Sequence, residues 1–292
     1  MYKKLVSYRY VENSTHYLRD NIEFYCRFCK TQKNKSNFKK KAHAVAECIG
    51  NKTLRTKYEC DECNDHFSKN EENELSKLIK FYKVIRGIGG KHGKTKLEHL
   101  SATFNEEEKT LQLSFKNVGI LYSKQFDKNQ KERLVLIHYE KINARLVYCA
   151  FLKFILSIVP ENKLPDFVKA FDILERPENN KKFLLDVILY KDIKRDYTIS
   201  LYENLTLDNN LPKYIGVIDV YQFSYIIFLD YENKCNFIPP QIIADVLNID
   251  KEQFASDPFY VDYSLTEKPI CQIEEISGVI ENLTSVNIQK DV

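Results

Sequence analysis

Apolar residues recur at spacings of three and four between residues 65 and 86, which is the pattern of an amphipathic helix. Acidic residues lie in its first turns and basic residues in its last turns, as the helix dipole favours. The glycine-rich segment 87–93 then disfavours further helix, so the helix is predicted to end there. The apolar positions of this predicted helix are Leu75, Leu78, Ile79, Tyr82 and Ile85.

Beyond residue 100 the apolar pattern changes between strand and helix. Apolar or alternating runs of strand length cover residues 109–117, 132–140, 197–203 and 213–232. Longer periodic runs predict helices over residues 143–159 and 165–175, with a turn or helix at 239–248, whereas residues 1–22 predict a leading strand or arm. The overall fold class is therefore α+β, with an N-terminal domain over residues 1–100 and a mixed α+β domain over residues 101–292.

Two Cys-x-x-Cys pairs stand out in the N-terminal domain. In the reducing compartment that we expect, such pairs indicate metal ligands and not disulfides. Four thiolates fill the tetrahedral coordination of Zn²⁺ and leave no position for water, so a structural zinc site is predicted. The pairs are separated by 30 residues, more than the roughly 15–20 of an ordinary zinc ribbon, so further structure is expected between them. The predicted zinc ligands are Cys26, Cys29, Cys60 and Cys63.

Charge is spread unevenly along the chain. Residues 23–100 hold 18 Lys and Arg against 10 Asp and Glu, an excess of 8 positive charges, although the whole chain carries only +3. A basic segment around a cysteine site favours a polyanion such as nucleic acid as a partner. The first residues contain no apolar signal-peptide core, and the most apolar stretch is too short to cross a bilayer. We therefore expect a cytoplasmic protein that does not enter a membrane.

Three short motifs follow one another along the N-terminal domain: "CRFC", "HAVAECIG" and "CDECN". Over residues 23–80 this order resembles the HNH endonucleases of the four-cysteine zinc branch, whose members carry C-x-x-C, then H-[IV]-[IV]-P-x-x-[LI]-G, then C-x-x-C-[NH]. The resemblance implies a treble-clef-like ββα-metal unit that presents a histidine beside a helix. His43 then takes the place of the general base, Asn64 the helix-borne metal-ligand position, and Asn51 that of a loop-bracing asparagine.

The chain departs from the family pattern at two positions. Ala42 stands where many members have Asp, Glu or His, often as a metal ligand, and Ala46 stands where proline is usual. His66 and Glu72 are the candidate replacements for the missing metal ligand.

The resemblance implies metal-dependent hydrolysis of phosphodiester bonds, in DNA in preference to RNA and in a setting such as bacterial defence or restriction. An imidazole, with an ordinary pKa of about 6.5, accepts a proton from water at neutral pH, and Mg²⁺ or Mn²⁺ takes up charge on the phosphoryl oxygens. The catalytic ion is expected at His43, Asn64 and His66. The nucleic-acid backbone is expected at Lys39, Lys40 and Lys41.

Each of these assignments has a structural alternative. His43 can be a buried structural histidine, Asn64 a helix N-cap and His66 a surface residue of the helix. The whole domain can be a non-catalytic zinc module that binds nucleic acid or protein. Residues 101–292 show no catalytic constellation, and target recognition, regulation, and a homo-oligomer or protein partner all remain open for them.

Overall fold

The structure of this chain is a computed structural model that describes part of the sequence. The described residues are 2–10, 14–18, 23–80, 83, 89–90, 93–94, 100–105, 110–115, 120–126, 132–140, 143–176, 185–189, 197–206, 211–220, 223–229, 246, 270–275 and 285–290. The predicted helix end at residues 84–88 and all of the segment 239–248 except Val246 lie outside them.

Two compact units make up the chain, and both mix strands with helical or irregular segments. The first contains Met1–Leu75, Ala144–Tyr190 and Lys194–Thr266, and the second contains Ser76–Asn143, Lys191–Ile193 and Glu267–Val292. This division differs from the predicted boundary near residue 100, because residues 16–63, which we call the cysteine region, pack with segments far along the sequence. The α+β fold class itself is confirmed.

An antiparallel five-stranded sheet forms the body of the first unit. Its strand order is β1-β13-β14-β15-β12, and all seven residues of β14 are buried at its centre. The predicted leading strand, the strand near residue 200 and the paired strands of 213–232 are all present. The bounds are β1 Tyr2–Arg9, β12 Leu185–Leu189, β13 Thr198–Asn204, β14 Tyr214–Val220 and β15 Phe223–Leu229.

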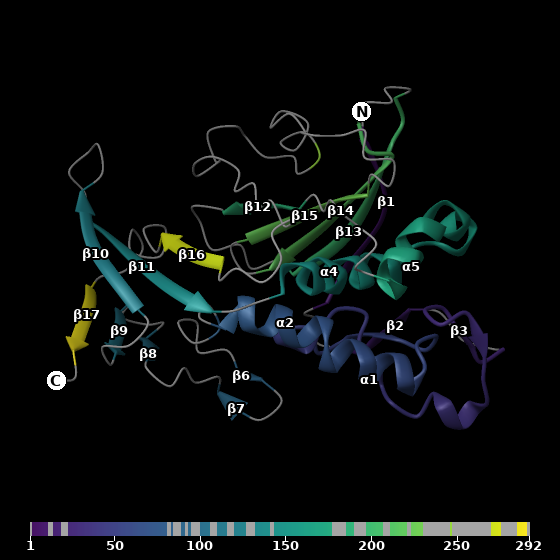
Figure 1. Ribbon diagram of the computed structural model, residues 1–292, viewed down its shortest axis with the longest axis horizontal. Helices are drawn as coiled ribbons and strands as arrows, with labels where there is room; N and C mark the ends of the chain where they lie inside the picture. The colour runs from purple at the N-terminus through teal and green to yellow at the C-terminus, as the bar shows by residue number, and fades with distance from the viewer. Residues whose placement is uncertain are drawn as a thin grey trace. The chain divides into compact units, whose positions relative to one another are not determined.

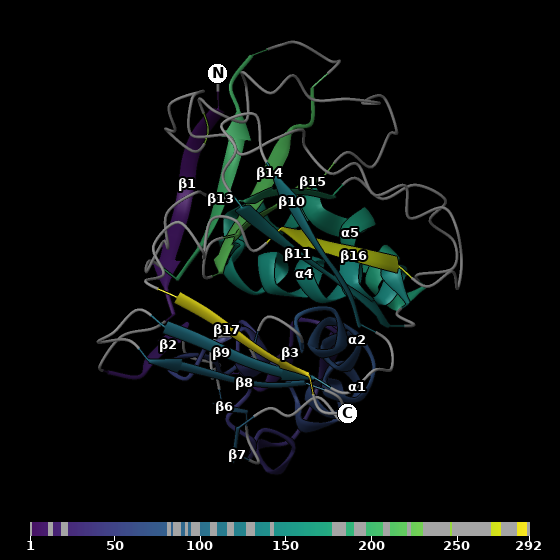
Figure 2. The ribbon, with the colours of Figure 1, turned by 90° about the vertical axis from the view of Figure 1, so that its left-hand side faces the viewer.

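Helix α4 (Ala144–Ile158) forms a middle layer of this unit, between the sheet and helix α1 (Asp61–Lys69) (Figures 1 and 2). It fits closely against the sheet at Gly216, where an added Cβ would lie only 2.5 Å from a side-chain carbon of Ile155. Helix α4 therefore has one side against the sheet and another toward the cysteine region. The 3₁₀ helix η3 (Glu161–Phe167) and helix α5 (Val168–Glu175) follow it. The helix predicted over residues 165–175 therefore corresponds to α5 and the end of η3.

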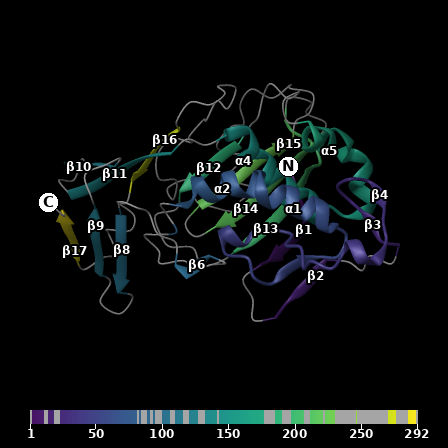
Figure 3. The same cartoon turned by 60° about the horizontal axis from the view of Figure 1, so that its bottom comes forward.

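The cysteine region consists of short elements. Strands β2 (His16–Leu18) and β5 (Leu54–Thr56) pair in parallel, β3 (Tyr25–Cys26) and β4 (Thr31–Gln32) form a small hairpin, and η1 (Lys35–Asn37) and η2 (Glu47–Ile49) are single 3₁₀ turns. The hairpin lies near α5, as Figure 3 shows and as the 6.3 Å between the rings of Phe28 and Phe171 confirms.

The predicted single helix from residue 65 is wrong in its bounds. Helix α1 begins at Asp61 and ends at Lys69, and α2 (Glu71–Leu78) follows after Asn70. Asn70 leaves helical geometry at φ −108° and ψ −83°, and its side-chain amide donates 2.8 Å to the carbonyl of His66. Leu75 and Ile79 are buried, as the periodicity predicted.

The second unit is described mainly by its strands. One sheet has the order β10-β11-β16 and another the order β17-β9-β8, with β17 parallel to β9. The strands predicted at 109–117 and 132–140 are confirmed as β9 and β11. The bounds are β6 Gly89–Gly90, β7 Gly93–Lys94, β8 Leu100–Asn105, β9 Thr110–Phe115, β10 Ile120–Phe126, β11 Glu132–Glu140, β16 Ile270–Glu275 and β17 Ser285–Lys290.

No helix in the described residues is both long enough and apolar enough to cross a membrane.

Candidate metal centre and histidine loop

The four predicted zinc ligands come together in space. The Sγ atoms of Cys26, Cys29, Cys60 and Cys63 all lie within 4.8 Å of one another. The Sγ atoms of Cys26 and Cys63 are 3.8 Å apart, and those of Cys29 and Cys60 are 4.0 Å apart. A tetrahedral ion with bonds of roughly 2.3 Å to sulfur needs edges of about 3.8 Å, so these separations fit Zn²⁺.

The surroundings of the thiols favour a thiolate at one corner of the cluster. The hydrogen bond with Cys63 lowers the pKa of Cys26 to about 4, although burial opposes this shift. The backbone N–H of Cys60, at the start of α1, lies 3.4 Å from the same sulfur and donates to it. Burial raises the pKa of Cys60. Four thiolates this close together repel one another, and a bound cation offsets this repulsion. Joint deprotonation of the four cysteines is therefore most favourable around a cation.

Arg27, inside the first cysteine pair, fastens this pair to the end of α4. Its side chain is 5% exposed, and its guanidinium pairs with Glu161 and lies 4.0 Å from the ring centre of Tyr58. Its Nη1 donates to three carbonyls at the end of α4, which have no partner within the helix. Those carbonyls belong to Leu156, Ser157 and Val159, at 2.9, 3.2 and 3.1 Å.

Between the two cysteine pairs, residues 42–56 form a loop that Asn51 closes. We call these residues the histidine loop. Asn51 is fully buried. Its amide donates to the carbonyls of Val45 and Leu54 at 2.5 and 2.8 Å, while its Oδ1 accepts from the N–H groups of Thr53 and Leu54. These four bonds hold the two ends of the loop together, which is the bracing role that the resemblance assigns to this asparagine.

His43 lies at the start of the histidine loop, in an antiparallel bridge with Arg55. Its side chain is 16% exposed, and its Nε2 is 3.3 Å from Oε1 of Glu47, one turn further along. Glu47 is therefore the acidic residue beside this edge of the imidazole. On either side of the bridge, Ala44 N–H donates to the Leu54 carbonyl and Thr56 N–H to the Ala42 carbonyl, at 3.1 and 2.9 Å.

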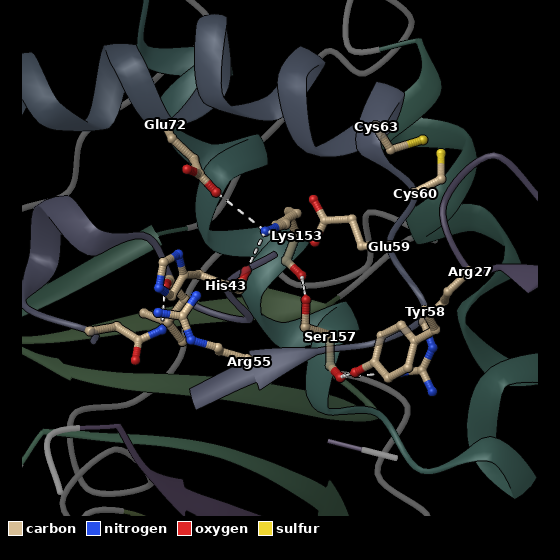
Figure 4. A network of polar contacts seen from close by, with 12 residues as sticks. Arg27, His43, Arg55, Tyr58, Glu59, Cys60, Cys63, Glu72, Lys153 and Ser157 are labelled. Atoms are coloured by element: carbon tan, nitrogen blue, oxygen red, sulfur yellow. Dashed lines mark hydrogen bonds and ion pairs between the residues drawn. The ribbon is translucent and has the colours of Figure 1, made fainter. Parts of the chain in front are cut away.

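A buried lysine from α4 lies beside this loop (Figure 4). The Nζ of Lys153 donates to the His43 carbonyl at 2.8 Å and lies 3.2 Å from a carboxylate oxygen of Glu59 and from one of Glu72. Burial raises the pKa of Glu59 to about 7. Burial also lowers the pKa of Lys153, but the two carboxylates outweigh it and raise that pKa above its usual value, so the lysine is charged.

The three lysines expected at a nucleic-acid backbone, Lys39, Lys40 and Lys41, are exposed. Lys40 forms an ion pair with Asp65 of α1, and its N–H donates 2.8 Å to Asp61. The backbone of this stretch is therefore fixed to the first turn of α1, and its charges are partly matched by acids.

The other predicted site residues lie along α1 and α2. Asn64 is in the first turn of α1, where it is half-buried, and its N–H donates to the Cys60 carbonyl. His66 is exposed, with Nε2 3.5 Å from buried Glu71. Glu72 points to Lys153. Within the part of the chain that the structure describes, the four cysteines are the only group of three or more His, Cys, Asp or Glu side chains spaced to hold a metal.

Sequence patterns did not single out Arg27, Tyr58, Glu59 or Lys153 as parts of the site. The one available signal was Lys153, a charge that interrupts the most apolar stretch of the chain. Comparisons with protein-family models, curated proteins and solved structures gave no match to this chain. Any function therefore rests on the geometry and chemistry of its own residues.

Proposed function

We propose that the cysteine region and histidine loop form an HNH-type endonuclease site that hydrolyses phosphodiester bonds in DNA with a divalent ion. The observation that carries this proposal is the joint arrangement of the sulfur cluster at the start of α1 and the loop that Asn51 closes behind His43. The three sequence pieces behind the resemblance thus occur in one compact unit. The basic excess of the region suits a polyanionic substrate.

In this proposal Zn²⁺ at the four cysteines is structural, because four thiolates leave no position for water. His43 accepts a proton from the attacking water, and the Glu47 carboxylate lies beside the imidazole. Mg²⁺ or Mn²⁺ supplies positive charge for the phosphoryl oxygens, and such ions bind through one or two side chains together with waters and phosphate. Asn64 on α1 is the proposed side-chain ligand, because an imidazole nitrogen that accepts a proton cannot bind the ion at the same time and His43 has the role of the base.

A second candidate is a zinc module that binds nucleic acid or protein without cleaving it. Three observations favour it. Ala42 offers no ligand, Glu72 is paired with Lys153, and His66 lies beside Glu71. In the part of the chain that the structure describes, the two residues considered as substitutes for the missing acid, His66 and Glu72, therefore contact other charged residues and do not form a metal site with His43.

The test is incubation of the purified chain with supercoiled plasmid and Mg²⁺ or Mn²⁺, with and without a chelator. Wild type should nick or linearise the plasmid only with the ion. His43→Ala should lower the rate about 100-fold or more, since general-base catalysis contributes roughly 10²–10⁴-fold, with DNA binding and thermal melting unchanged. His16→Ala, which removes an exposed histidine of β2, is the matched control and should cleave normally. Binding without cleavage by wild type would favour the zinc module.

A further inference from the structure

The ammonium group of Lys153 has polar partners although the lysine lies in an apolar helix. Its side chain is 1% exposed, and its neighbours Leu152 and Phe154 are buried. An ammonium group has three donors, and the three partners here are the His43 carbonyl, Glu59 and Glu72. Two of the three partners, the His43 carbonyl and Glu72, accept hydrogen bonds, and Glu59 adds an ion pair. A buried charge held on three sides in this way defines one geometry, because any shift leaves a charge unmatched.

The partners of Lys153 come from three separate segments. The carbonyl belongs to the histidine loop, Glu59 directly precedes the zinc ligand Cys60, and Glu72 lies in α2. Methionine has a similar length and would fill this space without the desolvation penalty of an ammonium ion. Stability alone therefore does not account for a lysine at this position, whereas a fixed arrangement of the three segments does.

The peptide unit after His43 is held at both of its polar atoms. Its carbonyl accepts from Lys153 Nζ at 2.8 Å, and its N–H, which belongs to Ala44, donates to the Leu54 carbonyl at 3.1 Å. Fixing this plane fixes the backbone from which the His43 side chain departs. Of these two hydrogen bonds, only the one from Lys153 comes from outside the histidine loop.

We infer that Lys153 is a positioning residue that sets the orientation of His43 through its backbone carbonyl, so that α4 is part of the nuclease site. This inference rests on the proposed function for its effect on catalysis. Lys153 does not touch substrate in this role. A displacement of about 1 Å at a reacting group lowers rates by as much as about 100-fold.

The variants Lys153→Met and Lys153→Met/Glu59→Gln test it. The single variant leaves the buried carboxylate of Glu59 without its cation and should melt at a lower temperature. The double variant removes that charge and should recover most of the melting temperature, but it still lacks the donor to the His43 carbonyl. We expect kcat for plasmid cleavage about 10–100-fold below wild type in the double variant, with KM within about twofold. Lys163→Met, which removes a half-buried ion pair with Glu203, is the control and should keep kcat.

Amide hydrogen exchange gives a readout that does not need cleavage. In the double variant the Ala44 N–H should exchange at least about tenfold faster, because the peptide plane has lost one of its two anchors, while amides of β14 keep their wild-type rates. A double variant with wild-type kcat and wild-type Ala44 exchange overturns the inference. If wild type does not cleave at all, the proposed function fails, and Ala44 exchange alone then decides whether Lys153 positions His43.

Discussion

Replacing Arg27 by methionine would detach the first cysteine pair from α4 while keeping a side chain of similar length. Wild-type Arg27 is buried, and its guanidinium donates to three carbonyls at the end of α4 and pairs with Glu161. Methionine keeps the apolar stem but has no donor. The carbonyls of Leu156, Ser157 and Val159 would then remain buried with one partner fewer.

The magnitude follows from the kind of contact that is lost. Leaving buried carbonyls without their charged donor costs about 1–3 kcal/mol, and the lost stacking of Arg27 on Tyr58 adds about 1 kcal/mol. The Glu161 side chain is 44% exposed, so water solvates the carboxylate that loses its partner. For a unit of this size, each kcal/mol lowers the melting temperature by about 2–4 °C. We therefore expect Arg27→Met to melt about 4–16 °C below wild type.

Thermal and urea unfolding followed by circular dichroism measure this difference. Lys30→Met is the matched control, since Lys30 lies in the same hairpin but forms an exposed ion pair with Asp172 at 3.9 Å, and exposed pairs of this kind contribute less than about 1 kcal/mol. If Arg27→Met costs no more than Lys30→Met, then Arg27 does not join the cysteine region to α4, and the reasoning is refuted.

Two further predictions concern the metal and pH. Cys60→Ser should reduce zinc content by elemental analysis from one ion per chain to none and lower the melting temperature sharply, whereas Cys48→Ser, outside the cluster, should keep its zinc; an unchanged melting curve for zinc-free Cys60→Ser would rule out a structural ion. The Tyr214 hydroxyl lowers the pKa of Asp166, and an ion pair lowers that of Glu203. Carboxylates with a lowered folded-state pKa stabilise the fold above their unfolded pKa of about 4 and lose this effect as pH falls through the folded value. Asp166→Asn should therefore flatten the loss of stability below about pH 4, and an unaltered pH profile would contradict this assignment.

The leading strand, the strands within 109–117, 132–140, 197–203 and 213–232, and α4 were predictable because their apolar runs have the length and period of the elements that they form. The four-cysteine cluster was predictable from spacing, since a metal site needs all its ligands whatever lies between them. The break at Asn70 was not predictable from periodicity, because the apolar spacing continues across it to Leu75 and Ile79. A single side-chain hydrogen bond to the His66 carbonyl accompanies the break, and such local bonds leave no trace in the hydrophobic pattern.

The contacts around the candidate site were hidden for a different reason. Lys153 was visible as a charge within an apolar helix, and a buried ammonium requires acidic partners. The partners that it has, Glu59 and Glu72, lie 94 and 81 residues away in the sequence and resemble ordinary acids near helix starts. No spacing rule connects them to Lys153. The contacts of Arg27 with the end of α4 span 129 to 132 residues. Together with those of Lys153, they join the cysteine region to α4 within one unit. The chemistry proposed for His43 therefore depends on α4 as well as on the residues that carry the family resemblance.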